Sequence, residues 1–516
     1  MNFDEMMSRT TLKDTGFDQS LEYIGRGCDA ALDAERTDVL RHLVTLAATV
    51  SRDTATPEKT ALLDYFLGNV WSGIKTLESR SRDSGWQWEN IAAENEIIHF
   101  RRAIELSENS ALSVHRVGQV TTNLANCYLT IGRPVEAIEL WRDAVAKQAT
   151  FGMSRGNLGR GLWKYALLLY DDRDRLILVQ EAWRYLDPAK LRGLDPGAGE
   201  AFARFRDEIE RAIPIEVLRK DVECDDGSLG KTEPEIAYRR WCLLARLFLN
   251  PLNDCGAFTL AACDRLTAPS IVSGANEGPK FHGFFNQLKQ EYVSARWLIY
   301  EALEPAEEGA HFADHDVLLF NTLDYPSYGL ATEKLKLGFR SLYSLFDKIA
   351  FFLNAYLGLQ IPETKVSFRN VWYQKRERKN GLREEFIARR NLPLKGLFWL
   401  SKDLYEDSTD FRVAMNPTAK RMSEIRHHLE HKYLKLHDEL WPGKLAADAF
   451  SDDLAHSMYR AELGTRSKEL LSLTRSAIIY LSLAVHREER LKAATAPKNR
   501  VTVPMNLDVW EDDWKK

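Results

Sequence analysis

An arginine and a histidine lie five residues apart in the segment from Arg426 to His431, whose sequence is Arg-His-His-Leu-Glu-His. An imidazole takes up and releases a proton near neutral pH, and a guanidinium binds phosphate oxygens through a planar fork of donors. The pair therefore predicts acid–base chemistry at a phosphate, in which His431 moves a proton and Arg426 stabilises negative charge. Pairs at this spacing also arise by chance, so the elements that carry the segment decide its meaning.

A single helix is predicted from Asn416 to Trp441, because Asn416-Pro417 is an N-cap signal and Trp441-Pro442-Gly443 is a stop signal. Between them, apolar residues recur at steps of three and four: Met422, Ile425, Leu429, Tyr433, Leu436 and Leu440. At about 100° per residue, Arg426 lies beside this stripe and His431 roughly opposite it. We expect His431 to face a cleft or a partner chain; the alternative is a solvated histidine on a charged face.

Other polar residues are predicted to support this pair. His427 shares a face with His431 and assists or tunes proton transfer, and Glu430 is placed to hold Arg426. On an apolar helix predicted from Thr332 to Leu359, polar residues repeat every seven positions: Arg340, Asp347 and Asn354. Buried polar groups need partners, so Asp347 and Asn354 either orient Arg426 or the substrate, or form a structural network.

A basic stretch precedes the Arg426 segment. Residues 365–395 contain ten lysines and arginines against three acidic residues, with aromatic side chains between them: Phe368, Trp372, Tyr373 and Phe386. Cations that follow phosphates beside flat rings that stack on unpaired bases are what single-stranded nucleic acid requires. The predicted RNA-binding residues are Arg369, Lys375, Arg376, Arg378, Lys379, Arg389 and Arg390. A solvated helical face is the alternative.

No metal and no cofactor are expected. His427 and His431 have a spacing that suits zinc, so a metal enzyme is one alternative, but the glutamate of a His-Glu-x-x-His motif is missing. A second cluster, formed by His311, Asp314, His315 and Asp316, lies in a predicted loop without a third imidazole nearby. The segment Gly230-Lys231-Thr232 lacks the first glycine of a phosphate-binding loop and a preceding strand, which argues against nucleotide hydrolysis.

The chain is predicted to be all-α, with four regions. Residues 1–55 form an N-terminal helical segment, residues 56–215 form paired amphipathic helices, residues 216–303 contain a linker and connecting helices, and residues 304–516 form an antiparallel bundle with a C-terminal arm. The segment Thr121–Ala149 has residues at the offsets of a tetratricopeptide repeat: Leu124, Ala125, Tyr128, Gly132, Ala137, Trp141 and Ala144. A solenoid of such repeats would offer a concave surface for a protein, peptide or ligand.

Composition sets the cellular context. The chain has no run of eighteen apolar residues and begins with acidic residues, so we expect no membrane span and no secretory signal. Its six cysteines show no paired spacing, which suits a reducing cytoplasm. A net charge of −5 does not by itself indicate a nucleic-acid-binding protein, so such a role has to rest on a local patch.

The chain resembles the HEPN superfamily (higher eukaryotes and prokaryotes nucleotide-binding), in a bacterial branch that joins a HEPN bundle to tetratricopeptide-like helices. The resemblance rests on Arg426 to His431, which fits the Arg-polar-x3-His pattern of the family's motif helix, and on the apolar helices around Asp347 and Thr474. It covers residues 300–495, with the solenoid similarity over 56–190. His427 stands where asparagine or aspartate is frequent.

This resemblance implies a metal-independent endoribonuclease that acts as a homodimer, with the two motif helices facing each other. His431 would promote attack of a ribose 2′-hydroxyl on the adjacent phosphate, giving cyclic phosphate and 5′-hydroxyl ends on tRNA or other single-stranded RNA. By analogy, we expect an effector in bacterial defence or a toxin-type system, with the solenoid as sensor of a protein or ligand trigger. The alternative is a non-catalytic scaffold that binds protein or nucleic acid and dimerises.

Overall fold

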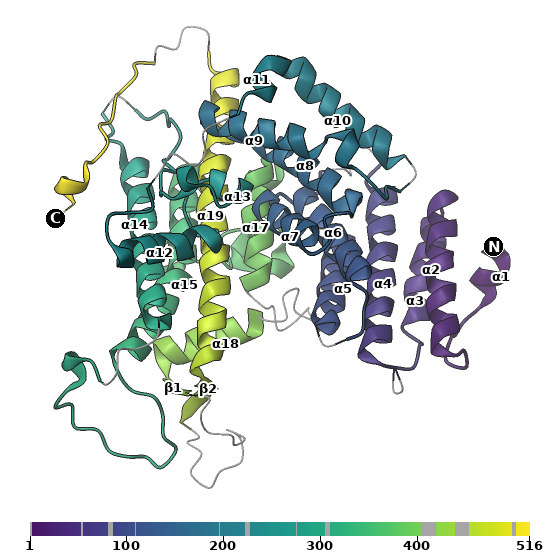
Figure 1. Ribbon diagram of the computed structural model, residues 1–516, viewed down its shortest axis with the longest axis horizontal. Coiled ribbons are helices and arrows are strands. Elements are labelled where there is room, and N and C mark those ends of the chain that lie inside the picture. Colours follow the sequence, from purple (N-terminus) through teal and green to yellow (C-terminus); the bar gives the residue numbers. More distant parts are fainter. Residues whose placement is uncertain are drawn as a thin grey trace.

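The computed structural model of the protein describes residues 3–52, 55–80, 86–108, 110–195, 197–221, 228–274, 276–304, 310–404, 419–438, 454–497 and 502–515. Helices make up nearly all of its regular structure, so the predicted all-α fold is confirmed. An array of helices containing the N-terminus lies beside a bundle containing the C-terminal half of the chain (Figure 1). Within the described residues, no helix is both long and apolar enough to cross a membrane.

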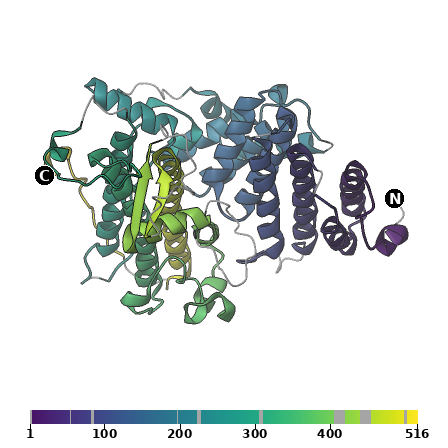
Figure 2. The ribbon, with the colours of Figure 1, turned by 90° about the horizontal axis from the view of Figure 1, so that it is seen from below.

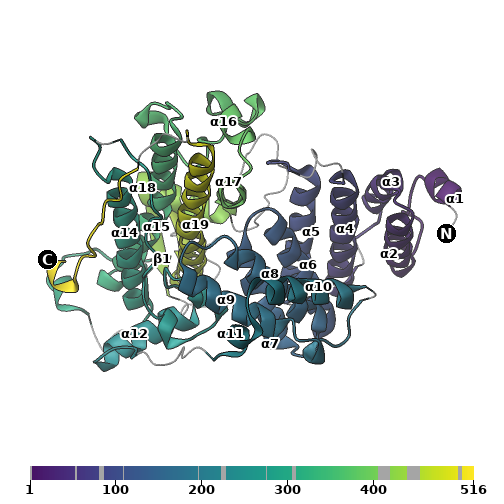
Figure 3. The same ribbon diagram turned by 90° about the horizontal axis from the view of Figure 1, so that it is seen from above.

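The N-terminal array consists of helices that pack against their neighbours in the chain. After the short helix α1 (Phe3–Ser8), its members are α2 (Phe17–Asp33), α3 (Thr37–Ala47), α4 (Pro57–Glu78), α5 (Ile91–Ser107), α6 (Val114–Thr130), α7 (Pro134–Lys147), α8 (Gly152–Ala166) and α9 (Asp172–Tyr185). The closest pairs are α4 with α5, α6 with α7 and α8 with α9, and the helices follow one another in a row in Figure 3. Tyr128 and Trp141 are buried between them. The similarity to tetratricopeptide repeats stays a prediction.

Short helices connect the array to the bundle. They are α10 (Ala198–Ala212), α11 (Ile215–Arg219), α12 (Glu233–Leu244) and α13 (Leu252–Cys255). The bundle itself contains α14 (Lys280–Leu303), α15 (Leu330–Leu357), the short α16 (Glu384–Ile387), α17 (Leu392–Leu404), α18 (Ala419–His431) and α19 (Arg460–Thr495). The long helix α19 contacts α14, α15 and α17 and forms the bundle's central axis (Figure 1). Because α14 packs along α15, the bundle begins before residue 304, the boundary expected from the sequence.

A small parallel sheet follows the Arg426 segment, where the sequence predicts continued helix. Helix α18 ends at His431, and strand β1 (Tyr433–His437) pairs with β2 (Ala455–Tyr459); Figure 2 shows both strands. The prediction of helix is therefore wrong over residues 433–437. Leu434 and Leu436 are buried on one face of β1, as strand alternation requires. The predicted start at Asn416, the stop from Trp441 to Gly443, and Leu440 lie outside the described residues.

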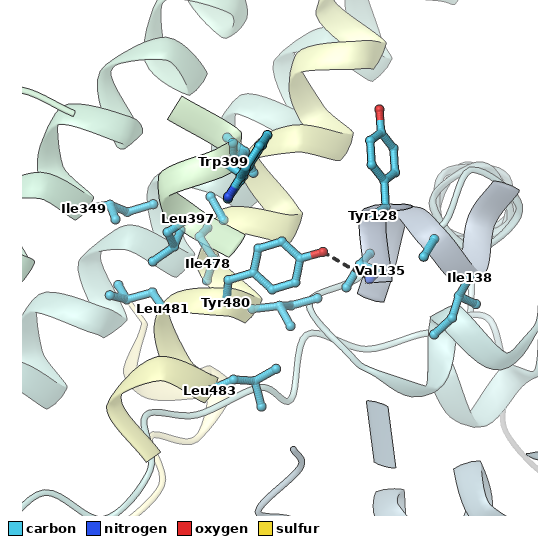
Figure 4. Packing of buried hydrophobic residues seen from close by; sticks show 14 of the residues in the cluster. Tyr128, Val135, Ile138, Ile349, Leu397, Trp399, Ile478, Tyr480, Leu481 and Leu483 are labelled. Atoms are coloured by element: carbon cyan, nitrogen blue, oxygen red, sulfur yellow. Dashed lines mark hydrogen bonds between the residues drawn. The ribbon is translucent and has the colours of Figure 1, made fainter. Parts of the chain in front are cut away.

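The array and the bundle are joined by a buried ionic network centred on Asp403 in α17. Arg101 of α5 donates to both carboxylate oxygens of Asp403 at 2.8 and 2.7 Å, and Arg133 donates to one of them. Burial would raise the pKa of Asp403, but the two guanidinium groups lower it to about 2. Tyr480 of α19 extends the network, because its hydroxyl bonds Glu136 and accepts from the amide of Val135 at 3.0 Å (Figure 4).

The same interface brings two backbones into contact. A Cβ atom on Gly132 would lie 2.2 Å from the carbonyl oxygen of Leu392, and one on Gly396 would lie 2.1 Å from the carbonyl oxygen of Gly132. Gly132 also has φ +91°, a conformation that other residues rarely adopt. Both glycines are therefore required for the close approach of the α6–α7 turn to α17.

Substitution of Asp403 by alanine should strongly destabilise the protein, because it leaves Arg101 and Arg133 buried without their shared carboxylate. Removing one partner of a buried ion pair costs about 3–5 kcal/mol. Urea unfolding followed by circular dichroism would measure the loss. Lys379→Ala is the matched control, since Lys379 pairs with Glu377 at the surface and its loss should change stability by less than about 1 kcal/mol. Equal effects of the two substitutions would contradict the role given to Asp403.

Candidate functional site

Helix α18 is held against α15 and α17 by its apolar side. Met422 and Ile425 are fully buried there, and Leu429 packs against the core while staying partly exposed. These contacts fix the rotation of the helix about its axis, so they decide which way each polar residue of the segment points.

Arg426 lies on the flank of α18 that faces α15. Its Nη2 donates to Oδ2 of Asp347 at 3.3 Å, and its guanidinium carbon lies 4.8 Å from the ring centroid of Tyr343. Asp347 also accepts a hydrogen bond from the amide of Phe368 at 2.9 Å. Burial raises the pKa of the Asp347 carboxyl, against the opposing effects of that amide and Arg426. Arg426 is thus held in one orientation by α15.

His431 is the last residue of α18, and its side chain is 65% exposed. It lies on the same side of the helix as the exposed His427, with ring centroids 5.6 Å apart. The orientation expected from the helical spacing is therefore the one observed, while the catalytic roles of both residues stay predictions.

Glu430 connects Arg426 with His431. Its Oε2 atom lies 3.3 Å from Nε of Arg426 and 3.7 Å from Nε2 of His431. The guanidinium and the imidazole therefore converge on one carboxylate oxygen, although they lie on different sides of the helix. A carboxylate oxygen is an anionic acceptor, as a phosphate oxygen is, so the same two groups are placed to contact one phosphate.

The residues that repeat every seven positions on α15 do not act together. Asp347 contacts Arg426, as expected if it orients that arginine. Asn354 instead bonds the amide of Ile361 at 3.0 Å and its carbonyl at 2.9 Å, so it closes the turn that follows α15. Arg340 is exposed. Asn354 therefore belongs to the structural network, the alternative considered from the sequence, and not to the site.

The aromatic residues of the basic stretch are in the core, so the prediction that they stack on bases is wrong. All four are buried: Phe368, Trp372, Tyr373 and Phe386. Their rings pack against one another and against Phe398 of α17. The segment lacks long helices of its own, so these side chains serve as its anchors to the bundle.

The predicted RNA-binding cations fall into two groups. Three form ion pairs: Arg378 with Glu89 and Glu94 of the array, Lys379 with Glu377, and Arg389 with Glu488. The other four are exposed: Arg369, Lys375, Arg376 and Arg390. The stretch is therefore not one continuous cationic surface.

A second polar cluster, which the sequence analysis missed, lies on the other flank of α18. The rings of His428 and His456 stack with centroids 4.6 Å apart, and Arg421 donates to Nε2 of His456 at 2.9 Å. Arg421 also pairs with Glu462 of α19 at 2.8 Å. Burial lowers the pKa of both histidines, and nearby cations contribute. His456 lies in β2, which the helical prediction did not anticipate, so no spacing rule connected it to His428.

The structure gives ordinary roles to the loop cluster considered as a metal site. Nδ1 of His311 accepts from the amide of Ala313 at 3.1 Å, and Asp314 accepts from the amide of Leu330 at 2.9 Å, at the start of α15. In the described parts of the chain, no three side chains of histidine, cysteine, aspartate or glutamate gather in a group that could hold a metal ion.

One comparison with known proteins finds a family similarity in the C-terminal part of the chain. Residues 272–488 match a family model described as LA2681-like HEPN. This part of the chain is therefore similar to a HEPN domain. The HEPN match contains α14 to α18 and both strands, with an N-terminal region before it, so Arg426, Glu430 and His431 all lie inside it. No curated protein and no solved structure matches the chain. Similarity to a HEPN domain points to RNA cleavage or nucleotide binding as the coarse function.

Two substitutions of Asp347 should have different effects on stability. Asp347→Asn keeps an oxygen that can accept from the Phe368 amide and removes a carboxylate whose ionised form burial disfavours, so stability should be unchanged or slightly higher at neutral pH. Asp347→Ala leaves that amide without its acceptor and should cost about 1–3 kcal/mol. Urea unfolding of both variants would measure this difference. Equal loss in the two variants would show that the amide bond is not what Asp347 contributes.

Proposed function

We propose that the protein is a metal-independent endoribonuclease whose catalytic residues are Arg426 and His431. The observation that carries the proposal is their convergence on Oε2 of Glu430, at 3.3 and 3.7 Å, inside the HEPN match. A phosphate oxygen at that point would lie within reach of a permanent cation and of a group that can exchange a proton. RNA cleavage by internal attack needs both and needs no metal.

In the proposed reaction, His431 accepts the proton of a ribose 2′-hydroxyl as its oxygen attacks the adjacent phosphorus. The P–O2′ bond forms, the P–O5′ bond breaks, and the leaving oxygen takes up a proton, which gives a 2′,3′-cyclic phosphate and a 5′-hydroxyl. Arg426 stabilises the additional negative charge of the transition state. DNA would not react, because it lacks the attacking hydroxyl.

The outward side of α18 is where we place a second copy of the chain. His427 and His431 are both exposed on that side, so two motif helices facing each other would bring four imidazoles to one groove. In this arrangement His427 would tune or assist proton transfer at His431. The homodimer follows from the family resemblance and supplies the enclosure that an exposed site lacks.

The N-terminal array is proposed to sense a trigger or bind a partner, in a bacterial defence or toxin-type system. Its contacts to α17 support this assignment, because the buried pairs of Asp403 with Arg101 and Arg133 connect the array to the bundle. The last described residue of α17 is Leu404, and α18 is the next helix in the chain. A change in the array would therefore act on the bundle close to the proposed site.

One observation favours a non-catalytic scaffold as the second candidate. Arg426 already contacts two carboxylates, Asp347 and Glu430, so the proposed site is occupied by the protein's own acidic groups. A scaffold would keep this arrangement permanently, whereas a ribonuclease would exchange Glu430 for the substrate phosphate. The two candidates differ in whether removal of the side chains abolishes a chemical activity.

His431→Ala and Arg426→Ala should abolish cleavage of tRNA or total RNA in the presence of EDTA. The loss expected from removing a general acid–base is about 10²- to 10⁴-fold, and that from removing a charge-stabilising group about 10²- to 10³-fold. Gel analysis with identification of cyclic phosphate ends measures both. His282→Ala, on α14, is the matched control and should cleave like the wild type. Cleavage that requires a divalent metal, or that survives both substitutions, would contradict the proposal.

Glu430→Gln should raise the basal rate of cleavage and weaken its dependence on any trigger. The amide keeps the shape of the side chain but removes the charge that competes with phosphate for Arg426 and His431. The Arg426–Glu430 pair is partly exposed and long, at 3.3 Å, so we assign it about 0.2–1 kcal/mol, as for a surface pair, which corresponds to an increase of about 1.5- to 5-fold in kcat/KM. Initial rates on a defined tRNA would measure it. A fall in rate equal to that of Arg426→Ala would instead make Glu430 a required holder of the arginine.

A further inference from the structure

The change from helix to strand after His431 places three different functional groups in consecutive exposed positions. His431 ends α18, Lys432 lies in the bend, and Tyr433 begins β1. Each of these side chains is exposed to solvent. An imidazole, an ammonium group and an aromatic ring therefore occupy consecutive exposed positions of the chain at the edge of the proposed active site.

Tyr433 offers an accessible aromatic ring at the open end of β1. The residue is 39% exposed, and its partner across the sheet is the small residue Ala455. Further along the same face of the strand, Lys435 is buried and pairs with Asp324 at 2.6 Å. The loop before α15 therefore covers this face of β1 beyond Tyr433 and leaves the first ring open.

Two neighbours fix the position of the Tyr433 ring. Its hydroxyl lies 3.2 Å from the hydroxyl of Tyr328, and the ammonium nitrogen of Lys435 lies 5.4 Å from its ring centroid. Tyr328 is itself 45% exposed. The ring is thus positioned before any ligand arrives, which reduces the entropy lost when a ligand stacks on it.

Lys432 supplies an exposed cation next to His431 and Tyr433 in the chain, and, in addition to burial, its charge contributes to the lowered pKa of His428. It is exposed, and no salt bridge or side-chain hydrogen bond holds it within the described part of the chain. This distinguishes it from Arg378, Lys379 and Arg389, which are engaged by carboxylates. Its charge is available to a phosphate.

We propose that His431, Lys432 and Tyr433 form a binding site for one nucleotide of single-stranded RNA next to the bond that is cleaved. A base stacks on Tyr433, Lys432 binds a phosphate, and the ribose lies toward His431. The bases of a paired strand stay inside their own stack, so a single-stranded segment fits this site. The inference rests on the proposed ribonuclease function and names the part of the substrate that this edge of the site selects.

Binding of an oligoribonucleotide that cannot be cleaved tests the inference apart from catalysis. The probe is a single-stranded 2′-O-methyl oligoribonucleotide containing 2-aminopurine, whose fluorescence is quenched when it stacks on an aromatic ring. Tyr433→Leu should remove the quenching and weaken binding about 5- to 100-fold, whereas Tyr433→Phe keeps the ring and should retain both. Trp514→Leu is the control, because Trp514 is 56% exposed in the C-terminal segment, far from β1 (Figure 1).

Lys432→Gln provides a second test, on an exposed side chain. Loss of one phosphate contact should weaken binding and reduce the slope of log K against log salt by about 0.7. If Tyr433→Leu and Lys432→Gln bind and quench like the wild type, the nucleotide site is overturned, whether or not the protein cleaves RNA. If both variants lose binding while the wild type leaves unmodified RNA uncut, the nucleotide site stands and the ribonuclease proposal falls.

Discussion

The architecture depends on the pairing of one buried carboxylate with one buried and one largely buried guanidinium group. Asp403 belongs to the bundle, while Arg101 and Arg133 belong to the array; Asp403 and Arg133 are almost fully buried, and the Arg101 side chain is only 15% exposed. A buried charge is tolerated only when it is paired. The ion triad therefore makes the two regions parts of one folded unit and fixes α17, against which α18 packs.

The candidate site has the opposite character, because it lies at the margin of the bundle. Met422 and Ile425 anchor the buried side of α18 to the bundle, but His431 and the start of β1 are exposed to solvent. Glu430, which is partly buried, lies between Arg426 and His431, where we propose that a substrate phosphate binds. The bundle interior is rigid, whereas the side chains of Arg426, Glu430 and His431 lie at its margin, where a ligand could rearrange them without disturbing the packed core.

The helical pattern predicted the orientation of His431 because Met422, Ile425 and Leu429 determine which side of α18 is buried. The same pattern failed after His431, since Leu434 and Leu436 satisfy the alternation of a strand, and only pairing with β2 decides between the two. The prediction that Phe368 and Trp372 stack on bases was also wrong, because both are buried. Cations beside aromatic residues are typical of an RNA-binding surface, but also of a core segment with a charged exterior. His456 could not be predicted, because its contact with His428 joins strand β2 to helix α18 and follows no regular spacing in the sequence.

The glycine contact between the α6–α7 turn and α17 has a consequence for how such chains diversify. At Gly132 and Gly396 the two main chains touch without any side chain between them. Replacing the array or the bundle by the corresponding region of another protein would therefore preserve the contact only if that region also has glycine at this position. The N-terminal region consequently cannot be exchanged on its own. A chimaera of this protein would have to replace the α6–α7 turn and α17 together.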